Sequence, residues 1–355
     1  MILQFGAGNF LRAFVDLFVS ETGFDEIFVV QSTGRDRADA LNRAAGRYHV
    51  TVQGIADGVL VDRTIGVNSV RRALYAETEW AEVETVAATP ELRWIVSNTT
   101  EAGFALDHRD AVPKRVPSSF PAKLLSVLLR RYESGLAGVM ILPCELIEEN
   151  GARLLDLVLS QAVRWEVAPA AVQWMREDCR WVNSLVDRIV PGPPKNHPLA
   201  EIDPLLLSAE PFALWAIESV DPFPLRHPAI LTATDIRPFA LRKIRILNGL
   251  HSALVCRALP LGIATVRDAM ENPSVAGWLE DLLLDEIVPV LEDRVEDPAG
   301  FGRTVLDRFR NPFLEHKLSS IALNHESKVN VRLRPTVAEY RAKFGREPRL
   351  LSELL

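Results

Sequence analysis

The sequence predicts an α/β protein, with a doubly wound parallel sheet in its N-terminal part and an all-α C-terminal part. In the first half, short β-rich runs such as residues 2–5, 27–30 and 92–96 alternate with segments of helical apolar spacing. Alternation of this kind implies a parallel sheet with helices on both faces. From about Ala240 the apolar spacing is helical nearly to the end of the chain, which indicates a separate helical domain.

The strands and helices are expected in a definite order. The strand at residues 2–5 leads through a glycine turn into a helix that begins at Asn9. Two β-rich runs on either side of Asp57 and Gly58 indicate a hairpin. Later elements are a buried strand at 92–96 with a polar loop at 97–101, a helix at about 121–133, and a strand ending at Pro143 with a polar loop at 144–150. Polar loops at strand ends are where such sheets bind ligands.

The composition is that of an ordinary globular protein and argues against several function classes. The 355 residues are 48% hydrophobic and 25% charged, which is enough chain for two domains and a large core. The net charge of −7 argues against nucleic acid as a partner, because phosphates favour a basic surface. Cys144, Cys179 and Cys256 fit neither a disulfide framework nor a zinc pattern, so we expect reduced thiols and no metal.

Neither a membrane anchor nor a secretion signal is predicted. No apolar run approaches the ~20 residues that a bilayer span needs. The first strand begins at residue 2, with no signal peptide before it. We therefore expect a cytoplasmic protein without a membrane partner.

The opening "LQFGAGNF" predicts a nucleotide-binding turn. Gly6 and Gly8 lie between a strand and a helix, where glycines let a pyrophosphate approach the backbone and the helix start presents N–H groups to it. Leu11 stands where the G-x-G-x-x-G fingerprint has its third glycine, so the motif is weak by itself. The prediction depends on its position at the start of a βαβ series.

The end of the second strand, "VVQSTGRDR", leaves the choice between NAD and NADP open. Asp36 could bind the ribose hydroxyls of NAD, whereas Ser32 with Arg35 could bind the 2′-phosphate of NADP. A solvated loop is the third possibility.

Two domains are expected, joined through the proline-rich stretch "PGPPKNHPLAEIDP" and a short strand in "FALWAIE". Residues 1–235 are assigned to a dinucleotide-binding domain of the Rossmann type, and residues 236–355 to a helical substrate domain.

The stretch "LRKIRILNGLHSALV" places three polar side chains in an apolar helix. At 100° per residue, His251 lies about 80° from Lys243 and about 60° from Asn248 around the helix axis. A buried lysine is a workable base for oxidising a secondary alcohol, an asparagine amide can stabilise the alkoxide, and a histidine can hold a hydroxyl. Spacing alone favours the plainer interpretation of a solvated lysine, an Asn-Gly break and a core histidine.

Similarity to known sequence motifs favours the catalytic interpretation of these three side chains over the plainer one. "LQFGAGNFLRAFVD", "VSNTTEAGF", "PCELIEENG", "NSLVDRIVP", "KIRILNGLHS" and "RFRNPFLEHKLSSIALNHESK" resemble motifs of the mannitol dehydrogenase family, the polyol-specific long-chain dehydrogenases. Within that family they look most like the tagaturonate reductases (altronate oxidoreductases). The motifs occur in order from residue 2 to about 335, which covers nearly the whole chain.

The resemblance implies a metal-independent enzyme that transfers hydride to or from a nicotinamide coenzyme, NAD with NADP not excluded. It implies Lys243 as acid and base, Asn248 and Asn183 as the oxyanion hole, and His251 as a partner of the reacting oxygen. It further implies a cofactor site formed by Gly6, Gly8, Asn9, Phe10, Arg12, Thr99 and Glu101.

The substrate implied is a sugar acid or polyol, with tagaturonate reduced to altronate by NADH as the favoured reaction. Fructuronate, mannitol and arabinitol are alternatives, and a non-catalytic NADH sensor is a more distant one. Candidate substrate-binding residues are Asn150, Arg308, His316, Lys317 and Lys328. For the last four, a solvated helix surface is the plainer interpretation.

Overall fold

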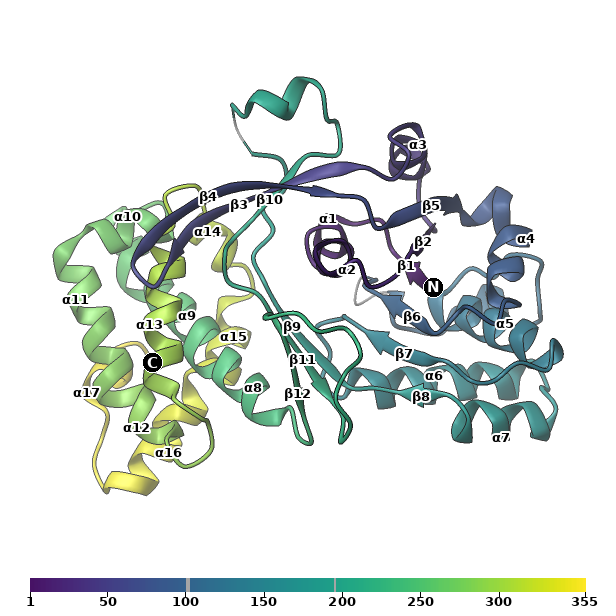
Figure 1. The fold of residues 1–355 in the computed structure, drawn as a ribbon. Coiled ribbons are helices and arrows are strands. Elements are labelled where there is room, and N and C mark those ends of the chain that lie inside the picture. Colours follow the sequence, from purple (N-terminus) through teal and green to yellow (C-terminus); the bar gives the residue numbers. More distant parts are fainter. Residues whose placement is uncertain (100–102, 195) are drawn as a thin grey trace. The chain divides into compact units, whose positions relative to one another are not determined.

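The computed structural model describes residues 1–99, 103–194 and 196–355 (Figure 1). The chain forms two compact units. The first comprises residues 1–51, 64–209 and 213–236, and the second comprises residues 52–63, 210–212 and 237–355. Two short segments that precede the main part of the second unit in sequence, 52–63 and 210–212, therefore belong to that unit.

A six-stranded parallel sheet forms the centre of the first unit (Figure 1). Its strands lie in the order β5 (Val70–Tyr75), β2 (Ile27–Gln31), β1 (Ile2–Phe5), β6 (Trp94–Ser97), β7 (Met140–Pro143) and β8 (Arg180–Trp181). Ile2 of β1 is in register with Ile27 on one side and Trp94 on the other. The order reverses between β1 and β6, so the crevice at their carboxyl ends is the expected ligand position of such a sheet.

Both faces of this sheet are covered, which explains why β1, β6 and β7 are almost continuously apolar. Leu3 and Phe5 share one buried cluster with Trp80, Leu124 and Leu154 on three different helices. On the other face, the ring of Trp94 lies 4.6 Å from that of Phe223. The helices of this unit are α1 (Asn9–Arg12), α2 (Val15–Thr22), α3 (Asp36–Arg43), α4 (Ala76–Ala87), α5 (Phe120–Glu133), α6 (Asn150–Arg164) and α7 (Pro169–Glu177), with 3₁₀ turns η2 (His108–Asp110) and η3 (Pro198–Glu201).

Two smaller sheets complete the β structure. One has the order β10 (Leu207–Ala209), β3 (Tyr48–Ala56), β4 (Val59–Val67), and the other β12 (Ile230–Ala233), β11 (Leu214–Glu218), β9 (Ser184–Asp187). The predicted hairpin is confirmed as β3 and β4. Its turn residues Asp57 and Gly58 have φ of 51° and 73°, and two consecutive positive φ values are characteristic of a type I′ hairpin turn.

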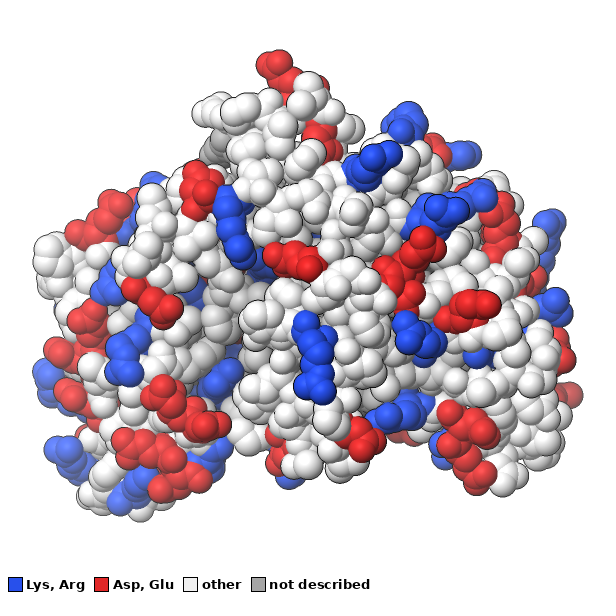
Figure 2. Space-filling model, viewed as in Figure 1, with Lys and Arg blue, Asp and Glu red and all other residues white. Residues whose placement is uncertain are grey.

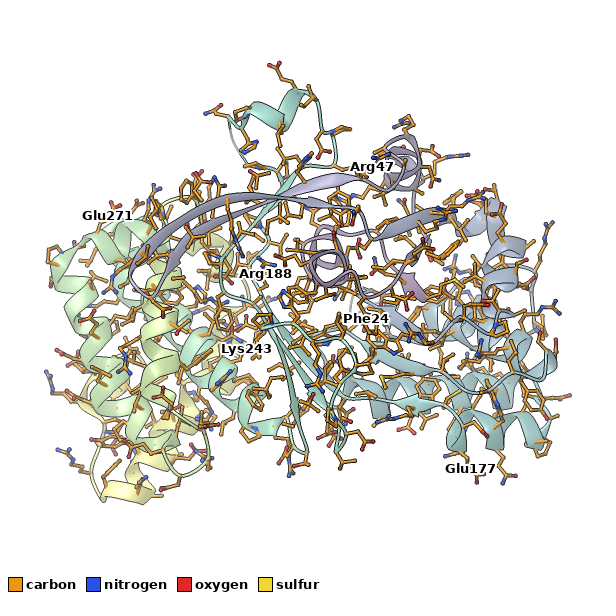
Figure 3. All side chains as sticks on the ribbon, viewed as in Figure 1. Phe24, Arg47, Glu177, Arg188, Lys243 and Glu271 are labelled. Carbon is orange, nitrogen blue, oxygen red and sulfur yellow. The ribbon has the colours of Figure 1, made fainter. Side chains whose placement is uncertain are left out.

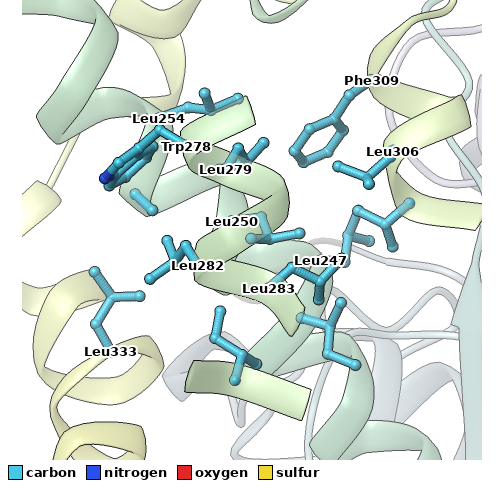
Figure 4. Close-up of a cluster of buried hydrophobic side chains, with 14 of the residues drawn as sticks. Leu247, Leu250, Leu254, Trp278, Leu279, Leu282, Leu283, Leu306, Phe309 and Leu333 are labelled. Carbon is cyan, nitrogen blue, oxygen red and sulfur yellow. The ribbon is translucent and has the colours of Figure 1, made fainter. Parts of the chain in front are cut away.

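The second unit is largely helical. Its buried cluster includes Leu247, Leu250, Leu283 and Phe309, which come from four helical segments, and Leu333, which lies in the turn between two further helices (Figure 4). The segments of this unit are α8 (Arg237–Arg242), η4 (Lys243–Asn248), α9 (Gly249–Ala258), η5 (Leu259–Leu261), α10 (Val266–Glu271), α11 (Pro273–Asp281), η6 (Leu282–Ile287), α12 (Val288–Leu291), α13 (Pro298–Phe309), α14 (Leu318–Ile321), α15 (His325–Arg332), α16 (Arg334–Phe344) and α17 (Arg349–Ser352).

The predicted fold class, a doubly wound parallel sheet followed by a helical C-terminal domain, is confirmed. No helix among the described residues is long and apolar enough to cross a membrane. Basic and acidic side chains are mixed on the face shown in Figure 2.

Candidate active site

The glycine turn follows β1 at the carboxyl end of the parallel sheet, next to the end of β6. Gly6 has φ of +125°, a conformation that side chains other than glycine rarely adopt. A Cβ at Gly6 would lie 3.1 Å from the carbonyl oxygen of Asn98, the residue that follows β6. Gly8 has an ordinary φ of −68° and caps α1, and a Cβ there would meet nothing within 4 Å. Gly6 is therefore required by the fold, whereas the space at Gly8 is open to a ligand.

Three further predicted cofactor residues lie on the first helix. Phe10 stacks on Phe14 with ring centroids 4.8 Å apart. Arg12 is buried, and its guanidinium donates to the Leu205 carbonyl oxygen at 2.6 Å and to Asn9 Oδ1 at 2.8 Å. Arg12 thus orients the Asn9 side chain, and this geometry favours an indirect role in any coenzyme site.

A buried carboxylate holds the loop after β6. Glu145, just beyond β7, accepts hydrogen bonds from the Thr99 N–H at 2.8 Å and from Ser97 Oγ at 3.0 Å. Burial raises the pKa of Glu145 above its ordinary value, while the bonds from Thr99 and Ser97 oppose that shift. The predicted cofactor residue Thr99 is therefore positioned by Glu145, which sequence reasoning did not select. Glu101 lies outside the described residues.

The side chains after β2 have specific partners. Arg35 is paired with Asp39 at 2.9 Å, and Gln31 accepts the Ala38 N–H at 2.7 Å. Arg37 donates to the carbonyl oxygen of Ala7 inside the glycine turn, at 3.3 Å. Of the cations in this segment, Arg37 is the one in contact with the turn.

The two predicted asparagines of the first unit have different surroundings. Asn150 is fully buried, and its amide donates to the carbonyls of Pro143, Glu145 and Ser184. It joins the end of β7 to the start of β9, so we do not propose it as a substrate ligand. Asn183 donates to Glu218 Oε2 at 2.6 Å and accepts the Ala152 N–H at 3.1 Å.

Lys243 and Asn248 lie at the two ends of a π-helical segment, η4, between α8 and α9. Figure 3 labels Lys243 at the first of these ends. In a regular α-helix, which the angular estimate from sequence assumed, residues five apart are about 140° apart around the axis. A π-helix bonds residue i to i+5, which brings residues five apart onto one side of the helix. The assumed geometry is thus wrong for this segment, and the observed one aligns Lys243 with Asn248 more closely. Single π-turns occur frequently at functional sites.

His251 lies one turn further along, on α9, and is buried. Its ring lies 4.3 Å from that of Phe309 and 4.9 Å from that of His316. Burial lowers the pKa of His251 well below 6.5, with further lowering by His316, Arg308 and Arg332, so the imidazole is neutral. A contact with the backbone of Leu247 opposes this lowering. The Nε2 atom of His251 is buried and has no hydrogen-bond partner among the described residues.

The predicted substrate cations are dispersed in the second unit. Arg308 is buried and pairs with Glu210 through two hydrogen bonds of 2.9 and 2.8 Å, and burial lowers the pKa of His316 below its ordinary value. Lys317 is exposed at the start of α14, and Lys328 donates to the Ile321 carbonyl oxygen at 2.8 Å. Of these four predicted cations, His316 contacts the ring of His251 and the charge of Arg308 lowers its pKa.

Sequence reasoning missed Arg332. Its Nη1 donates to the carbonyl oxygen of Asn248 at 3.4 Å and to Ser252 Oγ at 3.2 Å. The only available signal was its spacing four residues after Lys328 on a helix, which by itself does not separate a site from a solvated face. Among the described residues no group of three or more potential metal-ligating side chains occurs.

Comparison with known proteins identifies the family. Residues 1–230 match the model of the mannitol dehydrogenase Rossmann domain, and residues 235–354 match that of the mannitol dehydrogenase C-terminal domain. The chain belongs to the mannitol dehydrogenase family. It is accordingly an NAD-dependent oxidoreductase that acts on CH–OH groups, and the resemblance seen in the sequence is confirmed.

The curated relatives include altronate oxidoreductase of Bacillus subtilis (strain 168), which is 38% identical over 99% of this chain and 77% of that protein. Altronate oxidoreductase of Yersinia enterocolitica is 37% identical over 98% of this chain and 76% of that protein.

Two solved structures share the fold. D-sorbitol dehydrogenase in substrate-free form has a TM-score of 0.84 at 24% identity, covering 98% of this chain and 77% of that one. Mannitol 2-dehydrogenase of Pseudomonas fluorescens, in a ternary complex with NAD and D-mannitol, has a TM-score of 0.79 at 21% identity, covering 99% and 77%.

Proposed function

We propose that this protein reduces tagaturonate to altronate with hydride from NADH, and catalyses the reverse oxidation. The observation that carries the proposal is the π-helical segment that brings Lys243 and Asn248 onto one side, followed one turn later by the buried, neutral His251. The choice of substrate is supported by relatives named altronate oxidoreductase at 38% and 37% identity over almost the whole chain.

Lys243 is the proposed acid and base. In the reducing direction its ammonium gives a proton to the oxygen of the ketone as that oxygen gains negative charge, and in the oxidising direction the neutral amine removes the proton from the hydroxyl. A pKa near neutrality would let one residue act in both directions. A lysine is suited to this because its pKa responds strongly to its surroundings.

The oxyanion is stabilised by amide N–H groups. Asn248 supplies one from the same helix as Lys243. We propose Asn183 as the second donor. Its Nδ2 carries two N–H groups, of which one donates to Glu218. Glu218 and Ala152 together hold this amide in one orientation, which is the preorganisation that such a donor needs.

His251 is proposed to orient the substrate by accepting a hydroxyl proton at Nε2. Its ring contacts the backbone of Leu247 and the rings of Phe309 and His316, which restrict its orientation. A neutral acceptor beside a sugar hydroxyl adds no positive charge next to Lys243, so it does not disfavour the ammonium form of that lysine.

The coenzyme NADH would supply the hydride. The residues that fit it are Gly6 and Gly8, because the turn lies at the crevice beside β6 and is open at Gly8. Asn9, held by Arg12, and Thr99, held by Glu145, are proposed to border it.

The experiment is a measurement of absorbance at the nicotinamide band after tagaturonate is added with NADH, and separately with NADPH. Oxidation of NADH is the expected result. If no coenzyme is oxidised with tagaturonate but one is with fructuronate, fructose or another ketose, the substrate assignment is wrong and the catalytic one stands. If none of these is reduced while NADH still binds, the proposed reaction is wrong and the substrate lies outside these ketoses.

Lys243→Ala tests the mechanism in the same assay. Loss of a general acid lowers kcat by about 10²–10⁴-fold, and binding of NADH should be unchanged. Lys114→Ala, which removes an exposed lysine, is the matched control and should retain wild-type kcat. Unchanged turnover in Lys243→Ala would contradict the assignment of the acid.

A further inference from the structure

Two cations lie on one face of α15, beside the helix that carries Lys243, Asn248 and His251. Lys328 and Arg332 are four residues apart, a spacing that places side chains next to each other on a helix. α15 packs against both η4 and α9. A Cβ at Gly249 would be 3.8 Å from the Arg332 carbonyl oxygen, so the two helices approach closely at this point.

Both cations donate hydrogen bonds to neutral groups. Arg332 donates to the Asn248 carbonyl oxygen and to Ser252 Oγ, and Lys328 donates to the Ile321 carbonyl oxygen. Within residues 1–99, 103–194 and 196–355, neither cation is within ion-pair distance of a carboxylate. Arg308, in the same unit, shows the contrast: its guanidinium is held by the carboxylate of Glu210.

Lys328 and Arg332 therefore lack a negative charge to balance them within the described residues. Burial lowers the pKa of Lys328, and the like charge of Arg332, four residues away on the same helix, lowers it further. Partial burial adds to the cost, since it also lowers the pKa of Arg332. A bound anion would offset both the repulsion between Lys328 and Arg332 and the free-energy cost of burying their charges. Neutral backbone and hydroxyl partners orient the guanidinium without neutralising it.

We propose that Arg332, assisted by Lys328, binds the carboxylate of the substrate and thereby selects sugar acids over neutral ketoses and polyols. This inference rests on the proposed function and assigns the cation that the proposed substrate requires. The guanidinium has five N–H groups in a planar fork, so with Nη1 directed at Asn248 and Ser252 its other N–H groups can still pair with a carboxylate. Asn248 would then bind the reacting oxygen with its side-chain amide and orient Arg332 with its backbone carbonyl oxygen.

The test compares two substrates on one variant. Tagatose has the carbon skeleton of tagaturonate with CH₂OH in place of the carboxylate. In Arg332→Gln, kcat/KM for tagaturonate should fall by about 10–100-fold, the effect expected for losing a hydrogen bond between charged groups. kcat/KM for tagatose and KM for NADH should be unchanged. Arg334→Gln is the matched control, because that arginine is exposed and bonds only Asn330 among the described residues.

A wild-type protein that reduces tagatose too slowly to measure does not prevent the test. The readout is then KM, which should rise for tagaturonate in Arg332→Gln and stay constant for NADH. Should Arg332→Gln fail to fold, Arg332→Lys keeps the charge and loses the fork, and it should show a smaller rise in KM for tagaturonate.

Equal losses on tagaturonate and tagatose, or no loss on either, would overturn the role of Arg332 while leaving the proposed function intact. A wild-type protein that reduces neutral ketoses and no sugar acid would instead overturn the proposed function, and the inference with it. The two failures are therefore distinguishable.

Discussion

Arg308 and Glu210 form a bidentate ion pair whose side chains are 1% and 2% exposed. The guanidinium also lies over the ring of Phe212, 4.3 Å from its centroid. The pair joins α13 to the segment 210–212, which belongs to the same unit. Sequence reasoning offered Arg308 as a ligand for the substrate carboxylate, and this pairing indicates a structural role instead.

Glu210→Gln should strongly destabilise the protein. It removes the carboxylate partner of a buried guanidinium, and breaking a buried pair in this way costs about 3–5 kcal/mol. The free energy of unfolding, measured in urea, should fall by that amount. Glu280→Gln is the control, since Glu280 pairs with Arg310 at the surface and such pairs contribute about 0–1 kcal/mol. Equal effects of the two substitutions would contradict the structural role.

Gly6→Ala and Gly8→Ala should separate stability from coenzyme binding. Alanine at residue 6 requires a φ of +125° and a Cβ 3.1 Å from the Asn98 oxygen, so we expect a loss of about 1–3 kcal/mol in the free energy of unfolding. Alanine at residue 8 is compatible with the backbone and should leave stability unchanged, while its methyl group raises KM for NADH. Thermal unfolding and steady-state kinetics measure the two effects. A stable Gly6→Ala protein would show that the turn is not strained.

His251 should remain neutral throughout the useful pH range of the enzyme. Because its pKa lies well below 6.5, activity at pH 6.5 should show no loss from histidine protonation, although an ordinary histidine would be half protonated there. His251→Asn should lower kcat/KM for tagaturonate by about tenfold or more. His108→Asn, at a side chain that is 94% exposed, is the control. A pH–rate profile that falls near pH 6.5 in the wild type, and not in His251→Asn, would be evidence against a neutral His251.

Asp16 makes stability depend on pH in the unusual direction. Burial raises the pKa of Asp16 to about 7, against the bonds from Tyr48 and Gln4 and the charge of Arg12. The folded state therefore binds a proton that the unfolded state has lost between about pH 4 and 7, and the stability contributed by that proton disappears as pH rises through 7.

Asp16→Asn carries no charge at any pH, so it should be more stable than the wild type at pH 8. The difference in the free energy of unfolding between the two proteins should shrink as pH falls towards 5. Asp39→Asn, an exposed carboxylate paired with Arg35, serves as the control. A difference that is the same at pH 5 and pH 8 would rule out the titration of Asp16.

Local sequence patterns determined the fold class and the order of its elements. The strand at residues 2–5 and the turn at Gly6 and Gly8 could be located in the sequence. The period of apolar residues and the residue types of a turn depend only on neighbouring positions. Asp57 and Gly58 predicted the hairpin for the same reason, since both accept positive φ. The chain's membership of its family was also readable, because ordered motifs extend along nearly all of it.

Tertiary structure alone decided which polar groups meet. Arg308 and Glu210 are 98 residues apart in sequence, Arg332 and Asn248 are 84 apart, and Asn150 bonds Ser184 from 34 residues away. Sequence spacing reports the face of a helix on which a side chain lies, but it does not report which distant segment packs against that face. Buried polar groups must be satisfied wherever the packing leaves them. For this reason the sequence placed cations near the site but could not distinguish Arg308, which is paired with a carboxylate, from Arg332, which has no carboxylate partner in the part of the chain that the structure describes.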